Sequence, residues 1–401
     1  MSEPGVVRRV DWILAAAVAA LLALGYLTVS SATRTDIAGN PTYYASRELL
    51  YFGAGAVACL VIALLDLRRL RSLTGWLYTT TLVLLVSVLA LGTASAARGS
   101  SRWIPLPFFD FQVSEMGKVV MIVCLAAWTS AARARSDRGW GPLVSTGLRL
   151  LPVLALVFAE PDLGTSIVYA GIWLSILFVS GVPARQVLTV LAIPAAAAVL
   201  VVGVLPSRGI ELLHPYQHDR LTAFVDPSST SATAYQQRES RIAIGAGGLQ
   251  GRGPNGATQT NRNFLPEHHT DFVFAVIGEQ RGFLGAGIVL ALFSVIFWRA
   301  ARIIALAGTQ YEALIAAGVF GMLLLQVFVN IGMTLGIMPV TGIPLPFLTY
   351  GGANTITNMA AIGLLLAVFS RGAATSSPVR VRASIARAER VRRAGLAESE
   401  V

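Results

Sequence analysis

The sequence is poor in charge, and this shortage excludes most soluble classes of protein. Only 13% of its 401 residues are charged, while 55% are hydrophobic. A soluble domain of ordinary composition has about 25% charged residues. Apolar runs of about 17–25 residues recur along the chain, and each is long enough to cross a hydrocarbon core about 30 Å thick. The composition therefore predicts a polytopic membrane protein.

Cysteine and lysine are scarce as well. The two cysteines, Cys59 and Cys124, both lie inside apolar runs, so neither a disulfide nor a metal-thiolate site is indicated. Lys118 is the only lysine, against thirty arginines. The first apolar run is long and lacks the small-residue exit of a cleavable signal peptide, so we expect it to remain as a span.

The apolar runs predict an all-α fold of about ten transmembrane helices. We expect no internal repeat of 20–50 residues and no second soluble domain. An even number of spans places both termini on one side of the membrane. The expected spans are 11–31, 49–66, 75–95, 113–131, 147–160, 164–182, 186–206, 272–298, 311–337 and 350–370, the fifth and sixth forming a tight hairpin.

The arginines predict which side that is. They gather at the N-terminus, on alternate loops and in the tail, and the positive-inside rule makes all of these cytoplasmic. The net charge of +10 is then topological and does not indicate nucleic-acid binding. We divide the chain into a cytoplasmic N-terminus (1–10), a membrane domain (11–370) and a basic cytoplasmic tail (371–401). The large loop 207–271, between spans seven and eight, contains apolar and aromatic residues and predicts a folded extracytoplasmic cap.

The first polar stretch on the predicted outer side leads into the fourth span. It contains Arg102, Gln112, Glu115 and Lys118. Glu115 and Lys118 are spaced i, i+3, so they share one helix face. One interpretation is an interfacial ion pair whose lysine extends to the headgroups. The other is a functional pair, since ionisable residues inside a span mark sites by default.

The second polar stretch, "NFLPEHHTDF", precedes the eighth span. Asp271 stands where a helix should start, so an N-cap role competes with a functional one. His268 and His269 are adjacent, which is poor spacing for shared ligation on a helix, and no cysteine assists. The sequence therefore disfavours zinc here. Glu279 and Arg281, inside the span, predict a structural salt bridge to another helix.

The third stretch, "GIMPVTGIPLPFLTYGGANT" (336–355), is too rich in glycine and proline for a regular helix. Non-helical backbone at membrane depth is tolerated only where protein or water covers it, so we expect a cavity lining rather than a surface turn. "GAGGLQGRG" (245–253) has the glycines of a phosphate loop, but no lysine follows it, and a nucleotide site is poorly supported.

Together these stretches resemble the SEDS family of membrane glycosyltransferases, which includes RodA and FtsW. The resemblance covers nearly the whole chain, and the short N-terminus, "VDWIL" and "NFLPEHHTDF" favour the RodA branch. The strongest matches are "EPDLGTS", "YQHDRLTAFVDP", "RIAIGAGGLQGRG", "FLPEHHTDFVFAVIGEQRGFLG" and "MPVTGIPLPFLTYGG".

The chain departs from the family pattern at four positions. Val113 replaces the proline of Gln-Pro-Ser-Glu, and Asp110 stands where a basic residue is common. Glu160 replaces the Gln of Gln-Pro-Asp, and Ala353 replaces the serine of Tyr-Gly-Gly-Ser. None of these departures touches Glu115, Lys118 or Asp271.

The resemblance implies that the chain polymerises lipid II on the outer face of the cytoplasmic membrane, in rod-shape elongation rather than division. It implies a class B penicillin-binding protein as partner, within the elongation or division machinery. It makes Asp271 the catalytic residue, as a base or as the holder of a Mg²⁺ or Mn²⁺ ion. The expected cavity and substrate-binding residues are Glu115, Lys118, Arg102, Arg241, Glu267 and His269. A lipid II flippase and a non-catalytic scaffold for the penicillin-binding protein are the alternatives.

Overall fold

The structure is a computed structural model of the whole chain. It describes residues 10–34, 36–37, 39–91, 103–105, 110–135, 139–199, 219–220, 223–224, 226 and 229–375. Arg102, nearly all of the predicted N-terminal segment and most of the basic tail lie outside these residues.

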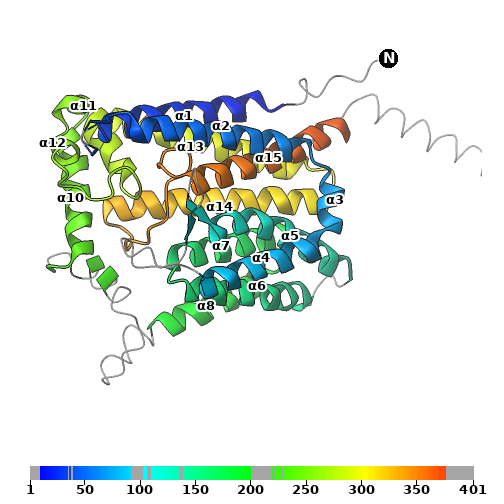
Figure 1. Ribbon diagram of the computed structural model, residues 1–401. Helices are drawn as coiled ribbons and strands as arrows, with labels where there is room; N and C mark the ends of the chain where they lie inside the picture. Colours follow the sequence, from blue (N-terminus) through cyan, green and yellow to red (C-terminus); the bar gives the residue numbers. More distant parts are fainter. Residues whose placement is uncertain are drawn as a thin grey trace, which may run out of the picture.

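Among the described residues, ten long helices occupy the ten predicted spans and confirm an all-α multi-pass membrane fold (Figure 1). Seven are long and apolar enough to cross a membrane, and two shorter apolar helices, Thr74–Ala90 and Leu163–Val179, accompany them. The ten are α1 Trp12–Ala32, α2 Tyr43–Leu64, α4 Thr74–Leu91, α5 Val113–Arg135, α6 Gly141–Ala159, α7 Leu163–Val179, α8 Ala184–Val199, α13 Val273–Leu306, α14 Gln310–Leu335 and α15 Gly352–Thr375.

Several helix boundaries differ from the predicted spans, and two of these differences have a physical reason. Helix α6 begins at Gly141, not at 147, because Pro142 in its first turn is preorganised for a helix start. Helix α13 runs for 34 residues and passes through Gly282, whose φ of +64° interrupts the helical backbone. A glycine tolerates that conformation without the steric cost a side chain would add.

Short elements connect the spans. Helix α3 (Leu67–Ser72) lies at one end of the bundle. An unpredicted hairpin pairs β1 (Trp103–Pro105) with β2 (Asp110–Gln112) and leads directly into α5. Helices α10 (Ala232–Gly247), α11 (Gly253–Gly256) and α12 (Thr258–Asn261) lie at the opposite end, which we call the cap end (Figure 1).

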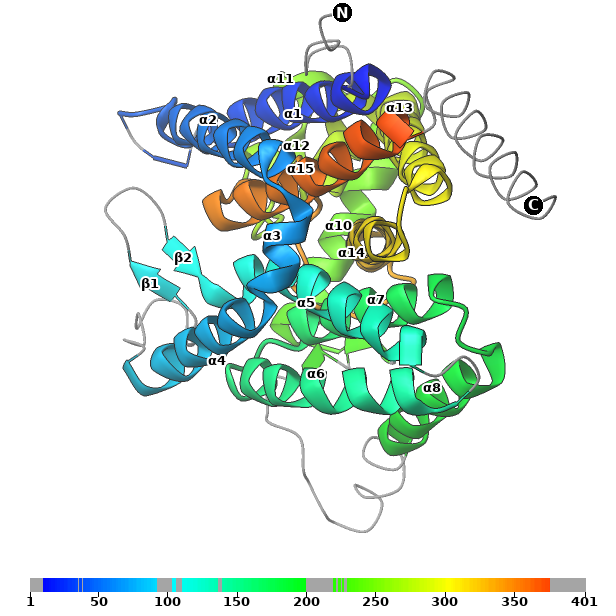
Figure 2. The same cartoon turned by 90° about the vertical axis from the view of Figure 1, so that its right-hand side faces the viewer.

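Helix α14 forms the centre of the bundle. It packs against α5, α7, α13 and α15, and Figure 2, viewed along the bundle, shows it between an upper and a lower group of helices. The upper group contains α1, α2 and α15, and the lower group contains α4, α6 and α8. Helix α15 packs most extensively on α2. Helices α14 and α15 are the most buried of the candidate spans. They therefore give rigid support to the chain segments next to them, including the segment that connects them.

Helix α10 docks on α13 through backbone contacts that only glycine permits. A Cβ atom at Gly247 would lie 1.9 Å from the Gly278 carbonyl oxygen, and one at Gly251 would lie 2.3 Å from the Gln280 carbonyl oxygen. The glycine-rich stretch thus serves close packing. Within the described residues, neither Glu279 nor Arg281 forms the predicted salt bridge. Glu279 accepts hydrogen bonds from the backbone of the short α12, and Arg281 donates to the Thr28 hydroxyl at 2.8 Å.

Candidate functional site

Asp271 lies in a turn before α13 and does not cap that helix. The N-cap is Phe272, and it makes no side-chain cap hydrogen bond, so the N-cap interpretation of Asp271 is wrong. The turn is held from behind by α14. Asn330 donates through one amide nitrogen to the carbonyl oxygens of Asp271 at 2.9 Å and Ile343 at 2.8 Å. These bonds fix the backbone of Asp271 against the segment between α14 and α15.

Arg220, which the sequence analysis did not select, lies beside the Asp271 carboxylate. Its Nη1 donates to the Thr341 carbonyl oxygen at 2.9 Å. A Cβ built on Gly342 would lie 3.6 Å from both Arg220 Nη2 and Asp271 Oδ2. Gly342 has a φ of +73°, a conformation that favours glycine, and its missing side chain leaves room for both charged groups. Arg220 lies within the motif "YQHDRLTAFVDP", which is the signal that could have found it.

Glu115 and Lys118 form a buried ion pair near the start of α5. Lys118 Nζ lies 2.7 Å from Glu115 Oε2, and the two residues are only 1% and 4% exposed. A lysine that extends to the headgroups would leave its ammonium exposed, so that interpretation is wrong. Because burying two charges costs several kcal/mol of desolvation per ion, the pair is stable only with both partners present.

Asp162, the N-cap of α7, bonds to residues just before this pair. It caps α7 by accepting from the Thr165 backbone N–H at 3.1 Å, and its other oxygen accepts from Gln112 Nε2 at 2.9 Å. The Tyr169 hydroxyl, on the same helix, donates to the Ser114 carbonyl at 2.9 Å. The sequence analysis quoted the motif that contains Asp162 but did not select either Asp162 or Tyr169.

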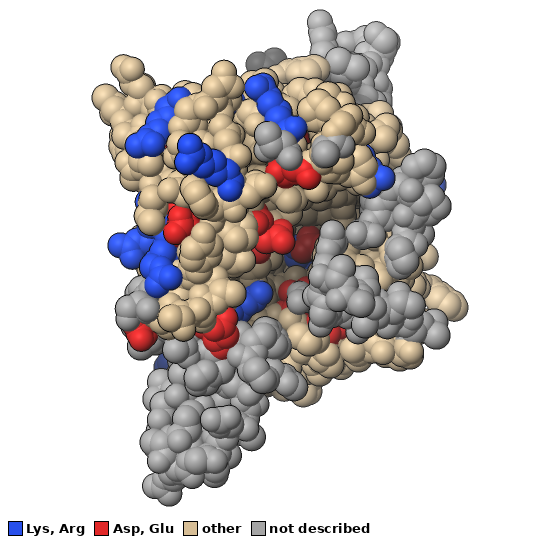
Figure 3. All heavy atoms as spheres, turned by 60° about the vertical axis from the view of Figure 1, so that its left-hand side comes forward, with Lys and Arg blue, Asp and Glu red and all other residues tan. Residues whose placement is uncertain are grey.

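The start of α7, which Asp162 caps, also contacts the segment between α14 and α15. A Cβ on Gly164, in the first turn of α7, would lie 2.8 Å from the Thr341 carbonyl oxygen that accepts from Arg220. The start of α7 therefore touches the segment beside Asp271. Figure 3, with the cap end turned forward, shows a hollow with acidic and basic side chains at its rim and inside it. That residues 336–355 line this hollow stays a prediction.

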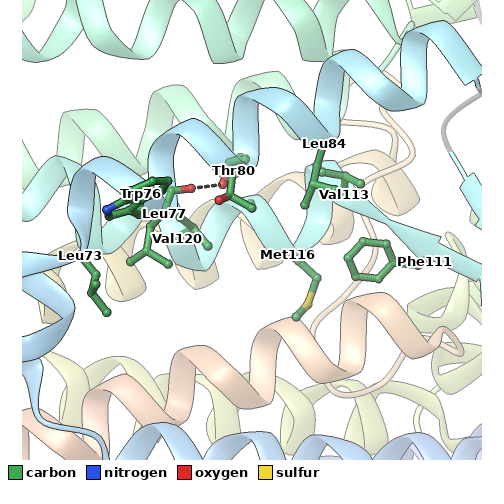
Figure 4. Close-up of a pocket in the computed structure, with 11 residues that line it drawn as sticks. Leu73, Trp76, Leu77, Thr80, Leu84, Phe111, Val113, Met116 and Val120 are labelled. Carbon is green, nitrogen blue, oxygen red and sulfur yellow. Dashed lines mark hydrogen bonds between the residues drawn. The ribbon is translucent and has the colours of Figure 1, made fainter.

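An apolar cavity of about 220 Å³ lies between α4 and α5 (Figure 4). Gly117, next to Lys118 in the chain, is part of its wall. The cavity therefore begins close to the buried ion pair, and its apolar lining suits a hydrocarbon chain. The lining residues are Leu73, Trp76, Leu77, Thr80, Thr81, Leu84, Phe111, Val113, Met116, Gly117 and Val120.

The remaining predicted site residues occupy different places. Arg241 is exposed on α10, with its Cδ 3.0 Å from the Cβ position of Gly336, at the end of α14. Glu267 is exposed, with a φ of +51°, and accepts from the Thr270 hydroxyl at 2.7 Å. The His269 ring lies against Tyr44, with their centroids 4.9 Å apart. Arg102 lies outside the described residues.

His268 is buried in the turn before α13, which also holds Asp271. Its ring faces the carboxylate of Asp36, in the segment between α1 and α2. Its Nε2 lies 3.3 Å from Asp36 Oδ2. Burial disfavours the charged imidazolium, but the Asp36 carboxylate outweighs it and raises the pKa of His268. The residues next to Asp271 are thus tied to the segment between α1 and α2 as well as to α14.

The site combines a carboxylate that can accept a proton, a guanidinium that can bind an anion, and an apolar cavity that can hold a hydrocarbon chain. A guanidinium presents a planar fork that matches phosphate oxygens. A carboxylate within hydrogen-bond reach of a hydroxyl acts as a general base. This combination suits group transfer from a lipid-linked phosphate ester.

Comparisons with known proteins place the chain in a family. The model of the family described as "Cell cycle protein", which covers FtsW, RodA and SpoVE, matches residues 8–372. The chain is 37% identical over 354 residues to peptidoglycan glycosyltransferase MrdB of Escherichia coli strain K12, covering 87% of this chain and 90% of that one. It is 34% identical over 355 residues to stage V sporulation protein E of Bacillus subtilis strain 168, covering 87% and 93%.

Solved structures agree with the sequence matches. A chain from a peptidoglycan synthase complex, described as coordinating polymerization and crosslinking, matches with a TM-score of 0.74 and 31% identity, covering 90% of this chain and 98% of that one. The rod shape determining protein RodA of Thermus thermophilus matches with a TM-score of 0.65 and 30% identity, covering 90% and 96%. The chain belongs to the SEDS family of FtsW, RodA and SpoVE.

Proposed function

We propose that this protein is a peptidoglycan glycosyltransferase that polymerises lipid II, with Asp271 as its catalytic carboxylate. The observation that supports it most directly is that Asp271 faces Arg220 beside Gly342 instead of capping α13. The relatives named peptidoglycan glycosyltransferase support the same reaction. The similarity to MrdB and RodA favours rod-shape elongation over division.

The reaction joins a sugar hydroxyl to the anomeric carbon of a second glycan, which is linked to undecaprenyl pyrophosphate. The new C–O bond forms as the bond between the anomeric carbon and the pyrophosphate oxygen breaks, and the leaving group departs with that electron pair. The hydroxyl proton goes to an Asp271 oxygen. An aspartate with a pKa of about 3.9 is a weak base toward an alcohol, so the proton moves late, when the oxygen is already bonding to carbon. General base catalysis of this kind typically accelerates a reaction by about 10²–10⁴-fold.

The departing pyrophosphate needs positive charge, and Arg220 supplies it beside Asp271. Its Nη1 is held by the Thr341 carbonyl, so the guanidinium is oriented before the substrate binds. Lys118 lies deeper and is paired with Glu115. We propose that this pair orders the start of α5, next to the apolar cavity that receives part of the undecaprenyl tail.

A Mg²⁺ or Mn²⁺ ion at Asp271 stays a proposal, and the described residues fit it poorly. The single group of three potential metal ligands among them does not include Asp271. An ion at Asp271 would take its other ligands from pyrophosphate oxygens and water, as Mg²⁺ commonly does. The positive charge of Arg220 beside the carboxylate would weaken such binding.

We also propose the membrane arrangement and the partner. The cap end, with Asp271, faces the outside, and both termini face the cytoplasm, as the arginine distribution indicates. A class B penicillin-binding protein, which crosslinks the glycan, is the partner. The chain's similarity to a member of a complex that coordinates polymerization and crosslinking supports this assignment.

The decisive experiment is polymerisation of labelled lipid II by the purified protein with its partner. We expect glycan strands from the wild type and a loss of about 10²-fold or more in Asp271→Asn, which keeps the side chain's size but removes the base. The control is Asp66→Asn, because Asp66 is half-exposed at the α3 end of the bundle.

Two outcomes would contradict the assignment. Movement of lipid II across vesicle membranes without polymer would make the protein a flippase. Normal glycan synthesis by Asp271→Asn would remove the carboxylate from the mechanism and favour a scaffold role.

A further inference from the structure

Three potential metal ligands from two distant segments converge at the cap end. Asp36 lies between α1 and α2, and His268 and His269 lie in the turn before α13. One donor atom from each residue lies within 4.8 Å of the other two. Among the residues that the structure describes, this is the one group of three with such spacing.

The spacing of the donor atoms suits a tetrahedral metal ion. Zinc binds imidazole nitrogen and carboxylate oxygen at about 2.0–2.1 Å, which places tetrahedral neighbours about 3.3–3.4 Å apart. Asp36 Oδ2 lies 3.3 Å from His268 Nε2 and 3.9 Å from His269 Nδ1. To reach this spacing, His269 Nδ1 would have to move about 0.5 Å closer to Asp36 Oδ2.

His268 is oriented as a metal ligand would be. Its Nδ1 lies 3.1 Å from the Leu265 carbonyl oxygen, and an N–H donated there leaves the lone pair on Nε2. A backbone carbonyl in this position is a common partner of metal-binding histidines. The residue is only 5% exposed, and its buried Nε2 is paired with Asp36 Oδ2 at 3.3 Å. A buried nitrogen directed at a carboxylate and a second imidazole therefore indicates a shared ligand.

The argument from sequence against zinc rested on the poor spacing of adjacent histidines on a helix and on the lack of an assisting cysteine. The adjacent histidines lie in a turn and not on a helix, so both rings can face one point. The third ligand, Asp36, comes from a segment that sequence spacing could not bring to the pair. Two imidazoles and one carboxylate also suit zinc better than Mg²⁺ or Ca²⁺, which prefer oxygen ligands.

We propose that Asp36, His268 and His269 bind one divalent transition-metal ion, with Zn²⁺ the best fit. The ion would tie the segment between α1 and α2 to the turn that holds Asp271. The site is separate from Asp271 and from any cation bound to the substrate. Its existence does not depend on the glycosyltransferase reaction. Three protein ligands leave a fourth position for water.

The test is metal binding by the full chain in detergent, with no histidine tag and after removal of metal by a chelator. Zn²⁺ is titrated calorimetrically, and the bound metal is counted by mass spectrometry after dialysis. We expect one Zn²⁺ per chain, with binding weakened about 100-fold or more in Asp36→Asn and in His268→Gln. Asp66→Asn removes a carboxylate at the α3 end and should bind as the wild type does.

Two further measurements test the proposal. Co²⁺ in place of Zn²⁺ should give the intense visible absorption of a tetrahedral site in the wild type and not in Asp36→Asn. Hydrogen exchange of residues 264–272 should slow when Zn²⁺ is added to the wild type alone. Equal Zn²⁺ binding by the wild type and both ligand variants would show adventitious binding, and no binding by the wild type would show a metal-free ion pair. Either outcome overturns the proposal.

Discussion

Arg220 and Asp271 share the space that Gly342 leaves open, and their roles can be separated by substitution. Arg220→Lys keeps the positive charge but loses the planar fork that matches phosphate oxygens. We expect polymerisation to fall about 10-fold in Arg220→Lys and about 10²–10³-fold in Arg220→Gln, the range for removal of one preorganised donor. Both rates come from the lipid II assay, with Arg262→Gln, an exposed arginine at the cap end, as control. Equal rates in Arg220→Gln and Arg262→Gln would exclude Arg220 from the site.

The buried pair Glu115–Lys118 predicts a stability effect that is independent of activity. Lys118→Met leaves a buried carboxylate unpaired, and loss of one partner of a buried ion pair costs about 3–5 kcal/mol. We expect a large fall in the detergent melting temperature for Lys118→Met and recovery of most of it when Glu115→Gln is added. With Glu115→Gln also measured alone, a double-variant loss of stability equal to the sum of the two single losses would mean that the two residues do not interact energetically.

The sequence predicted some of these residues and could not predict others. Glu115 and Lys118 are i, i+3 neighbours on one helix, so local spacing was enough. Asp271 stood out because it precedes a span within a long motif. Arg220 and Asp36 meet their partners only through the tertiary fold. Hydrophobic periodicity in a single sequence cannot predict these contacts, because the contacts depend on how the connecting segments fold back at the cap end.

At the scale of elements, the packing of α10 on α13 depends on the missing side chain at Gly247. Gly247→Ala would push a methyl group into the Gly278 carbonyl, which is backbone and cannot move aside cheaply. Gly245→Ala is the matched control, because it lies on the same helix and a Cβ there meets nothing within 4 Å. We expect Gly247→Ala to expose α10 to limited proteolysis and Gly245→Ala to be neutral or slightly stabilising, since alanine favours helix by about 1 kcal/mol over glycine.

Equal proteolysis of the two alanine variants would contradict the close contact between α10 and α13. The comparison also tests why the glycine-rich stretch exists. If its glycines served a phosphate, both variants would leave α10 docked and would weaken substrate binding instead.

Composition alone predicts some of the elements, such as the membrane-spanning helices. Other features, such as helix starts and short strands, depend on local residues or on tertiary pairing. Ten apolar runs gave ten helices because a membrane span must satisfy its own backbone hydrogen bonds. The start of α6 was placed too late because Pro142 was not recognised as a first-turn proline. The β1–β2 hairpin was missed because each strand has only three residues, too few for an alternating pattern.

At the scale of the whole molecule, sidedness is the property on which the proposed function depends, and it can be measured in cells. Cys59 and Cys124 are buried, so the native chain should react little with a membrane-impermeant maleimide. Arg262→Cys would place an exposed thiol at the cap end, and Ser72→Cys would place one at the α3 end. In cells whose outer barrier is permeable to the reagent but whose cytoplasmic membrane is intact, we expect labelling of Arg262→Cys alone. Ser72→Cys should label only after lysis, and the reverse pattern would put Asp271 on the cytoplasmic side, where it could not polymerise lipid II on the outer face.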